Sequence, residues 1–315
     1  MRTLALLLAL AFTFPHATRA QQNEPWLKAG DVVALVGGED MVALAEEGWL
    51  ETLVTWGQPK DHIRFRSLAW EGDTVFEQRR DLNYPTLETQ LDRMGATVVI
   101  CQFGLMESLA GKEGVAAFTE AYGKLIDRLN PEKKRRISLV KPHDFGFPQE
   151  RTAAVNLSGQ RLSVRNLNEY IYAISHVAAQ RGARHEDPRE PGKPTLSPTR
   201  DGVHLSAEEQ EWKARTLADG YGSIDLEDVL AHPLSARHLA TQQALRAAIV
   251  AKNRLWFHYT RPQNWAFLAG NRTNQPSSRD HLDPSKRWFP EEMEQWVPLI
   301  EAKEKEIWAL AAAPR

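Results

Sequence analysis

The feature that most constrains this fold is an alternation of short apolar segments, rich in β-branched residues, with longer amphipathic segments. Short apolar segments of this kind are typical of buried strands, and parallel sheets bury their strands on both faces. Their alternation with helices predicts an α/β fold, in which a parallel sheet lies between two layers of helices. The four predicted strands are DVVALVG at 31–37, IRFRSLAW at 63–70, ATVVICQF at 96–103 and RISLVKP at 136–142.

The segments between and after these strands carry the periodicity of helices. In the segment 112–129, apolar residues recur at intervals of three and four, which places them on one face of a helix. The same spacing recurs between Val164 and Ala178. We expect this three-layer core to span residues 21–222. Residues 223–315 contain no strand pattern, so we expect them to form a helical C-terminal extension that packs on the core.

The N-terminus differs in kind from the rest of the chain. Arg2 precedes an apolar run from Leu4 to Phe14, and a small residue, Ala20, follows. This order of a basic, an apolar and a small-residue region predicts a secretory signal peptide over residues 1–20. We therefore expect an exported protein, periplasmic or secreted. No later segment is apolar for long enough to cross a bilayer, so we expect no membrane span.

Charge and cysteine content exclude further classes of function. The formal net charge is −2 and the sequence pI is about 6.6, so the whole molecule offers no basic field for nucleic acid. The single cysteine, Cys101, cannot form an internal disulfide, and it stands in an apolar run that predicts burial. We therefore expect no nucleic-acid partner.

The segment TRDGVHLSAEE at 199–209 is the first candidate for chemistry. It places Asp201 and His204 three residues apart on a loop before a predicted helix. An imidazole that moves protons needs a carboxylate to orient it and to stabilise its charged form. In open parallel sheets, active groups gather at the carboxyl ends of the strands. The loops there are GGEDM at 37–41, AWEGDT at 69–74, QFGLMES at 102–108 and KPHDFGF at 141–147. His143 in the last of these loops is a further candidate for the same cleft.

Taken in this order, the loops resemble the sequence blocks of the SGNH, or GDSL-like, hydrolases. That family has a Gly-Asp-Ser block after the first strand, a glycine after the second, a Gly-x-Asn block after the third and a late Asp-x-x-His block. Here Gly72 matches the second block, Gly104 begins the third and Asp201 and His204 form the fourth. The C-terminal segment is also similar to an extension found in some exported bacterial members. The resemblance implies a three-layer, flavodoxin-like α/β/α fold and hydrolysis of ester bonds, with acyl esters of carbohydrate as the expected substrate.

Two positions depart from the family pattern. Alignment of VALVGGEDM on the first block puts Gly38 on the aspartate and Glu39 on the nucleophilic serine, and Met106 replaces the asparagine of the third block. The resemblance then implies that His204 is the acid or base, that Asp201 orients it and that Glu39 occupies the nucleophile position. Further candidates for substrate contact, which these alignments and the aromatic extension suggest, are Gly38, Gly72, Gly104, Glu107, Arg261 and Asn264.

Three hypotheses follow from these departures. In the first, the protein is an ester hydrolase in which Glu39 acts as a base for water or as a direct nucleophile; Ser108 is a weaker candidate for the nucleophile. In the second, the chain is catalytically silent and its cleft binds a carbohydrate or a cell-envelope ligand. In the third, Glu39, Glu107, Asp201 and His204 hold a metal ion. One imidazole without a second histidine at ligand spacing disfavours a metal site, so we expect neither a metal nor a cofactor. A Glu39–His204 ion pair would raise the pKa of His204 and suit it to act as an acid.

Overall fold

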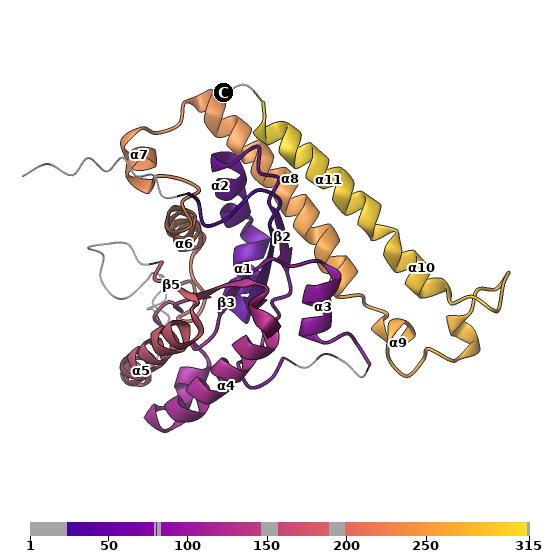
Figure 1. The fold of residues 1–315 in the computed structure, drawn as a ribbon, viewed down its shortest axis with the longest axis horizontal. Coiled ribbons are helices and arrows are strands. Elements are labelled where there is room, and N and C mark those ends of the chain that lie inside the picture. The colour runs from indigo at the N-terminus through magenta and orange to yellow at the C-terminus, as the bar shows by residue number, and fades with distance from the viewer. Residues whose placement is uncertain (1–23, 79, 81–82, 146–156, 189–198, 314–315) are drawn as a thin grey trace, which may run out of the picture.

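The computed structural model of this protein describes residues 24–78, 80, 83–145, 157–188 and 199–313 (Figure 1). The predicted signal peptide, residues 1–20, lies outside these ranges. Among the described residues, no helix is long and apolar enough to cross a membrane.

The centre of the molecule is a parallel sheet of five strands in the order β2-β1-β3-β4-β5. The four predicted strands are all present, which confirms the α/β prediction, and β5 is an additional strand. The bounds are β1 Val32–Gly37, β2 Arg64–Ser67, β3 Val98–Gln102, β4 Arg136–Val140 and β5 Arg184–Glu186. The sequence analysis missed β5 because it is only three residues long, polar, and paired with β4 alone.

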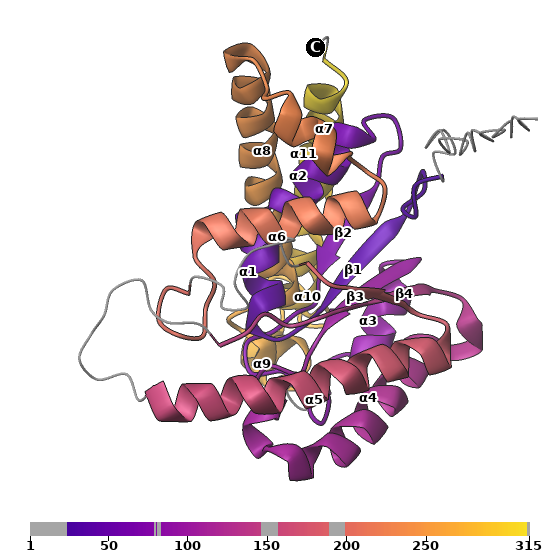
Figure 2. The same ribbon diagram turned by 90° about the vertical axis from the view of Figure 1, so that its left-hand side faces the viewer.

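Helices cover both faces of the sheet, as Figure 2 shows. One face packs against α1 Glu39–Glu47, α2 Trp49–Gly57 and α6 Ala207–Gly220. The other packs against α3 Leu87–Arg93, α4 Val115–Leu129 and α5 Leu157–Arg181. Successive residues of a strand point to opposite faces, so Val33 and Leu35 enter the first core while Ala34 and Val36 enter the second. Cys101 is buried in the second core, as predicted.

The predicted helix at 112–129 is confirmed with one difference at its start. Residues Lys112–Gly114 form a 3-10 turn and α4 begins at Val115. The apolar positions on the predicted face of α4 that are buried are Phe118, Tyr122, Leu125 and Leu129. The remaining 3-10 turns are Glu107–Ala110, Pro131–Lys133 and Pro276–Ser278.

The C-terminal extension consists of helices that pack on the core. In Figure 1, α8 and α11 run side by side along the β2 side of the sheet. The bounds are α7 Leu226–Ala231, α8 Ala236–Thr260, α9 Trp265–Leu268, α10 Trp288–Glu294 and α11 Trp296–Ala311. Trp256 and Ile300 from this extension enter the core that α3, α4 and α5 also cover.

Helix α8 also supplies hydrogen bonds to the outer edge of the sheet. Lys252 Nζ donates to the carbonyl of Phe65 at 3.0 Å, and Trp256 Nε1 donates to the carbonyl of Ser67 at 2.7 Å. Lys252 is fully buried and pairs with both oxygens of Glu51 on α2, each at 2.8 Å. The free edge of β2 is thus occupied by side chains of the extension, and an exposed edge would otherwise offer these carbonyls to other chains.

Candidate active site

The loop after β1 brings Glu39 to the carboxyl end of the sheet. Gly37 ends β1, and a Cβ atom there would lie 2.5 Å from the carbonyl oxygen of Gln102, so only glycine fits this close approach. Gly38 precedes the first turn of α1, which begins with Glu39 and Asp40. The chain therefore enters a helix directly from the strand, and two acidic side chains stand at the amino end of that helix, where the helix dipole favours negative charge.

The side chain of His204 lies between two carboxylates. Its Nε2 is 2.6 Å from Glu39 Oε1, and its Nδ1 is 2.5 Å from Asp201 Oδ2. The other oxygen of Asp201 accepts the backbone N–H groups of Val203 at 3.0 Å and His204 at 2.8 Å. Asp201 is thus fixed by the loop that carries it, and it orients the imidazole toward Glu39. The structure brings together the three residues that the sequence analysis proposed as catalytic.

This arrangement determines which groups carry charge. Burial opposes ionisation of Asp201, but the two backbone N–H groups and His204 outweigh it and lower the pKa of Asp201 to about 2. Partial burial acts to lower the pKa of His204, and the hydrogen bonds and charges of Glu39 and Asp201 overcome it, so the pKa is raised. Both ring nitrogens face carboxylate oxygens, and a ring protonated at both nitrogens donates to each of them. The imidazolium form of His204 is a proton donor rather than a base.

Glu107 holds the second and third loops together. Its carboxylate oxygens accept the backbone N–H groups of Val75 and Gly104, each at 2.8 Å. Burial raises the pKa of Glu107, although these backbone hydrogen bonds oppose the change. Glu107 and Gly104 nevertheless line the pocket that Glu39 and His204 line, so their contact with a substrate stays a prediction. Ser108 is buried and its hydroxyl donates to the carbonyl of Leu105 at 2.6 Å, so it does not present a nucleophile.

The residues proposed from the second loop and the extension lie outside the pocket that Glu39 and His204 line. The pocket includes Asp73 but not Gly72. Arg261 pairs with Glu71 at 2.6 Å and also donates to the carbonyl of Ala69, so it supports the loop that contains Gly72. Asn264 precedes α9 and its carbonyl accepts the N–H of Phe267 at 3.0 Å. Contact of Gly72, Arg261 and Asn264 with a substrate therefore stays a prediction that this pocket does not support.

A buried polar network that the sequence analysis did not foresee lies behind the pocket. Asp40 Oδ2 is 2.7 Å from His143 Nδ1, accepts Gln102 Nε2 at 2.9 Å and is 3.4 Å from Lys213 Nζ. Lys213 also donates to Gln102 Oε1 at 2.6 Å, and His143 Nε2 lies 2.5 Å from the carbonyl oxygen of Val203. This network connects the first turn of α1 to the loop of His204.

Within this network, the negative charge of Asp40 lies beside His143 and the positive charge of Lys213. Burial opposes ionisation of Asp40, but His143 and Lys213 hold its pKa well below the usual range. Burial lowers the pKa of Lys213, and Asp40 opposes that change.

The sequence contained one signal that Lys213 would be buried. Gln210, Lys213, Ala214 and Leu217 have the spacing of residues on one buried face of a helix.

The pocket against the three proposed catalytic residues is small. Its volume is about 40 Å³, and it is lined by backbone and side chains of the four strand-ending loops, including Gly38, Gly104 and the partly exposed Met106. A cavity of this size holds a few water molecules or a group as small as acetyl. Within the described ranges, no group of three or more His, Cys, Asp and Glu side chains is arranged to hold a metal ion.

Comparisons with known proteins show likeness in structure only. No protein-family model matches this sequence, and no curated protein matches it either. The solved structure of BT4096, a gut microbial diltiazem-metabolizing enzyme, matches with a TM-score of 0.62 at 11% identity, over 90% of this chain and 96% of that chain. A catalytic mutant of Axe2, an acetylxylan esterase from Geobacillus stearothermophilus, matches with a TM-score of 0.45 at 16% identity, over 62% of this chain and 96% of that chain.

Identities this low show the fold and leave the activity open, since one fold hosts many functions. The chain has the predicted three-layer α/β fold with a helical C-terminal extension.

Proposed function

We propose that this protein hydrolyses esters of small acyl groups by a route in which Glu39 and His204 move the protons and no serine takes part. The observation that carries the proposal is the continuous line from Glu39 through His204 to Asp201, with contacts of 2.6 Å and 2.5 Å. A catalytic triad consists of a nucleophile, an imidazole and a carboxylate that orients the imidazole. Here the carboxylate of Glu39 takes the position of the nucleophile. The charged imidazole makes Glu39 the proton acceptor and His204 the proton donor.

In this route, a water oxygen attacks the ester carbonyl carbon while Glu39 accepts a proton from that water. The carbonyl π electrons move to oxygen and form a tetrahedral oxyanion. When the oxyanion collapses, the bond to the alcohol oxygen breaks and His204 donates its Nε2 proton to that oxygen. Ester and water become acid and alcohol, which leaves Glu39 protonated and His204 neutral. The proton then returns from Glu39 to His204 across the 2.6 Å contact.

The developing oxyanion has a donor set at the start of α1. In the first turn of α1, the N–H groups of Met41 and Val42 donate to the carbonyl of Gly38, so the proposed donors are the backbone N–H groups that precede them. The side-chain amide expected in the third loop is replaced by Met106, and loss of one such donor typically costs about 10²–10³ in rate. We therefore expect a slow enzyme whose oxyanion is held by backbone groups alone.

The finer parts of the proposal concern the substrate and the place of action. The pocket of about 40 Å³ supports an acyl group no larger than acetyl. The resemblance to SGNH hydrolases supports a carbohydrate as the alcohol part of the ester. The predicted signal peptide supports action in the periplasm or outside the cell, and recovery of processed protein from those fractions would test this.

A silent binding protein is the second candidate. Glu39 stands at the position that the family resemblance assigns to the nucleophilic serine. Its ion pair with His204 replaces the hydrogen bond that such a serine would form with the imidazole. Met106 removes an oxyanion donor as well, so both departures fall on catalytic positions. In that case the same loops would hold an acylated carbohydrate without turnover.

Hydrolysis of 4-nitrophenyl acetate and acetylated xylo-oligosaccharides by the purified protein separates the two candidates. The variants are His204→Ala, Glu39→Gln and Glu39→Ser, and Glu46→Gln on the same helix is the matched control. Thermal melting of each variant checks that it folds. Turnover by the parent that both His204→Ala and Glu39→Gln abolish supports the proposed route. Turnover that appears only in Glu39→Ser supports the silent binding protein.

A further inference from the structure

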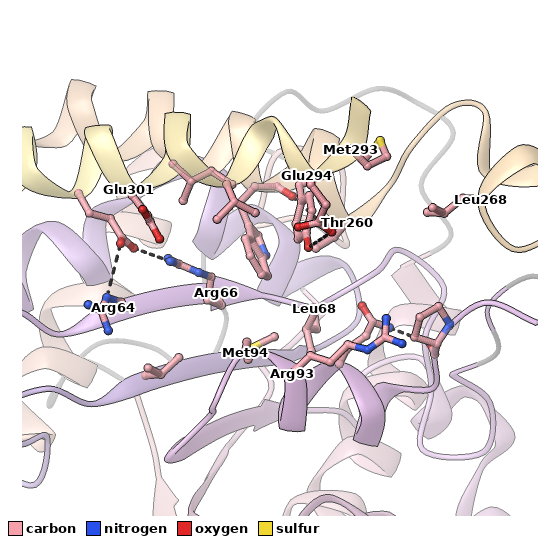
Figure 3. Close-up of a pocket in the computed structure, with 18 of the residues that line it drawn as sticks. Arg64, Arg66, Leu68, Arg93, Met94, Thr260, Leu268, Met293, Glu294 and Glu301 are labelled. Carbon is pink, nitrogen blue, oxygen red and sulfur yellow. Dashed lines mark hydrogen bonds and ion pairs between the residues drawn. The ribbon is translucent and has the colours of Figure 1, made fainter. Parts of the chain in front are cut away.

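A large cavity lies away from the candidate active site. It has a volume of about 680 Å³ and lies over β2, between α3 on one side and α10 and α11 on the other (Figure 3). Small-molecule sites in proteins occupy about 300–1,000 Å³ and occur preferentially where two parts of a structure meet. This cavity has that size and lies at the junction of the core and the C-terminal extension. Neither Glu39 nor His204 lines it.

The middle of the cavity is apolar. Leu68 directly follows β2, Met94 follows α3, Trp256 lies on α8, and Val297 and Ile300 lie on α11. In Figure 3, Leu68 and Met94 lie on the lower wall beneath the helices of the extension. The side chains are aliphatic or aromatic and come from both walls, so the cavity offers a surface that an apolar chain can cover.

One end of the cavity is closed by ion pairs that need no ligand. Arg66 pairs with Glu304 at 2.6 Å, and Arg64 lies 3.5 Å from the other oxygen of the same carboxylate. Figure 3 shows both arginines reaching from β2 toward α11 at this end. Both guanidinium groups at this end already face the carboxylate of Glu304, so we assign the polar end of a ligand to the other end of the cavity.

At the other end, Arg93 is a cation without an anion. Among the described residues, Arg93 forms no ion pair and no side-chain hydrogen bond, although it lines the cavity. Burial raises the pKa of Tyr84 to about 12, and the charge of Arg93 opposes that rise. Tyr84 donates to the carbonyl of Thr260 at 2.5 Å, and Tyr259 donates to Glu294 at 3.4 Å. Both hydroxyl donors are therefore engaged, and the guanidinium of Arg93 is a charged donor that a ligand at this end can reach.

These features define the charge of the ligand. A planar guanidinium binds a carboxylate through two parallel hydrogen bonds. Glu294 lies on the opposite wall and would repel a dianion such as a phosphate monoester. We propose that this cavity binds a monocarboxylic acid with an unbranched apolar chain, with its carboxylate on Arg93 and its chain between Leu68 and Ile300. Binding at this site is independent of ester hydrolysis.

Isothermal titration calorimetry with decanoate tests the site, and decanol is the neutral ligand of the same chain length. Arg93→Gln removes the charge, and Val297→Trp fills the apolar part of the cavity. Arg237→Gln, on an exposed turn of α8, is the matched control for loss of an arginine. His204→Ala excludes binding at the candidate active site. Thermal melting of each variant verifies that it is folded.

We expect one molecule of decanoate per chain, with affinity about tenfold or more lower in Arg93→Gln, since hydrogen bonds to charged groups are worth about 1.5–3 kcal/mol. Decanol should bind at least about tenfold more weakly than decanoate, by the same reasoning. Val297→Trp should abolish binding, and Arg237→Gln and His204→Ala should leave it unchanged. Absence of saturable binding, or undiminished binding to folded Val297→Trp, would overturn the site. Equal affinities for decanoate and decanol would overturn the carboxylate assignment.

Discussion

The ion pair between Lys252 and Glu51 provides a test of how the extension is joined to the core. Lys252 is 0% exposed and Glu51 is 6% exposed, so neither charge is solvated. Replacement of Lys252 by Met keeps an unbranched apolar side chain, one atom shorter, and removes the charge. Glu51 would then be buried without its cation, and the carbonyl of Phe65 would lose its donor.

The expected loss follows from this burial. Breaking a buried ion pair by removing one partner costs about 3–5 kcal/mol, because it leaves an uncompensated charge. Domains are stable by about 5–15 kcal/mol, so the loss is a large share of the whole. With an m-value of about 3 kcal/mol/M, the urea midpoint would fall by roughly 1–2 M.

Urea unfolding, followed by circular dichroism, measures this loss. Lys124→Met is the control, because Lys124 and Glu120 form a pair whose side chains are 72% and 68% exposed. Such a pair contributes about 0–1 kcal/mol. The double variant Glu51→Leu, Lys252→Met removes both charges and should recover most of the loss. A loss in Lys252→Met no larger than that in Lys124→Met would refute the reasoning.

Three further predictions concern the site. In an NMR titration, the imidazole of His204 should stay protonated above the ordinary midpoint of about pH 6.5, because its pKa is raised. Glu39→Gln should lower the pH of that midpoint. Equal midpoints in the parent and the variant would contradict the ion pair. Glu107→Gln should destabilise the fold by about 1–3 kcal/mol, because one backbone N–H would then face an amide NH₂ group, whereas Glu113→Gln at an exposed position should change the free energy of unfolding by less. Lys213→Met should cost about 3 kcal/mol or more in urea unfolding, because it leaves Asp40 with a buried charge and one cation fewer, and an unchanged midpoint would rule that out.

The sequence was most informative where a pattern repeats along the chain. Four strands and the apolar face of α4 follow from periodicity, since burial on both faces of a parallel sheet imposes it. β5 has no such pattern, because an edge strand of three residues needs little apolar surface. Glu39, Asp201 and His204 could be proposed because each stands at a strand end or in a short local motif.

Contacts between distant segments could not be predicted in the same way. The partners of Glu107 are backbone N–H groups, which every residue but proline offers, so no side chain in the sequence marks them. Arg261 was proposed as a ligand of the substrate because it is a charged residue in an aromatic segment. Its contacts with Glu71 and Ala69 arise only when α8 packs beside the loop after β2.

The network around Asp40 supports the loop of His204 separately from Glu39, the proposed catalytic carboxylate. Glu39 and Asp40 are adjacent in the first turn of α1, and each meets a different histidine. His143, held by Asp40, supports the carbonyl of Val203 next to His204, so the loop of His204 keeps its place without help from Glu39. We therefore expect substitutions at position 39 to leave the position of the His204 loop unchanged. A serine, a glutamine or the native glutamate at position 39 would face the same imidazole.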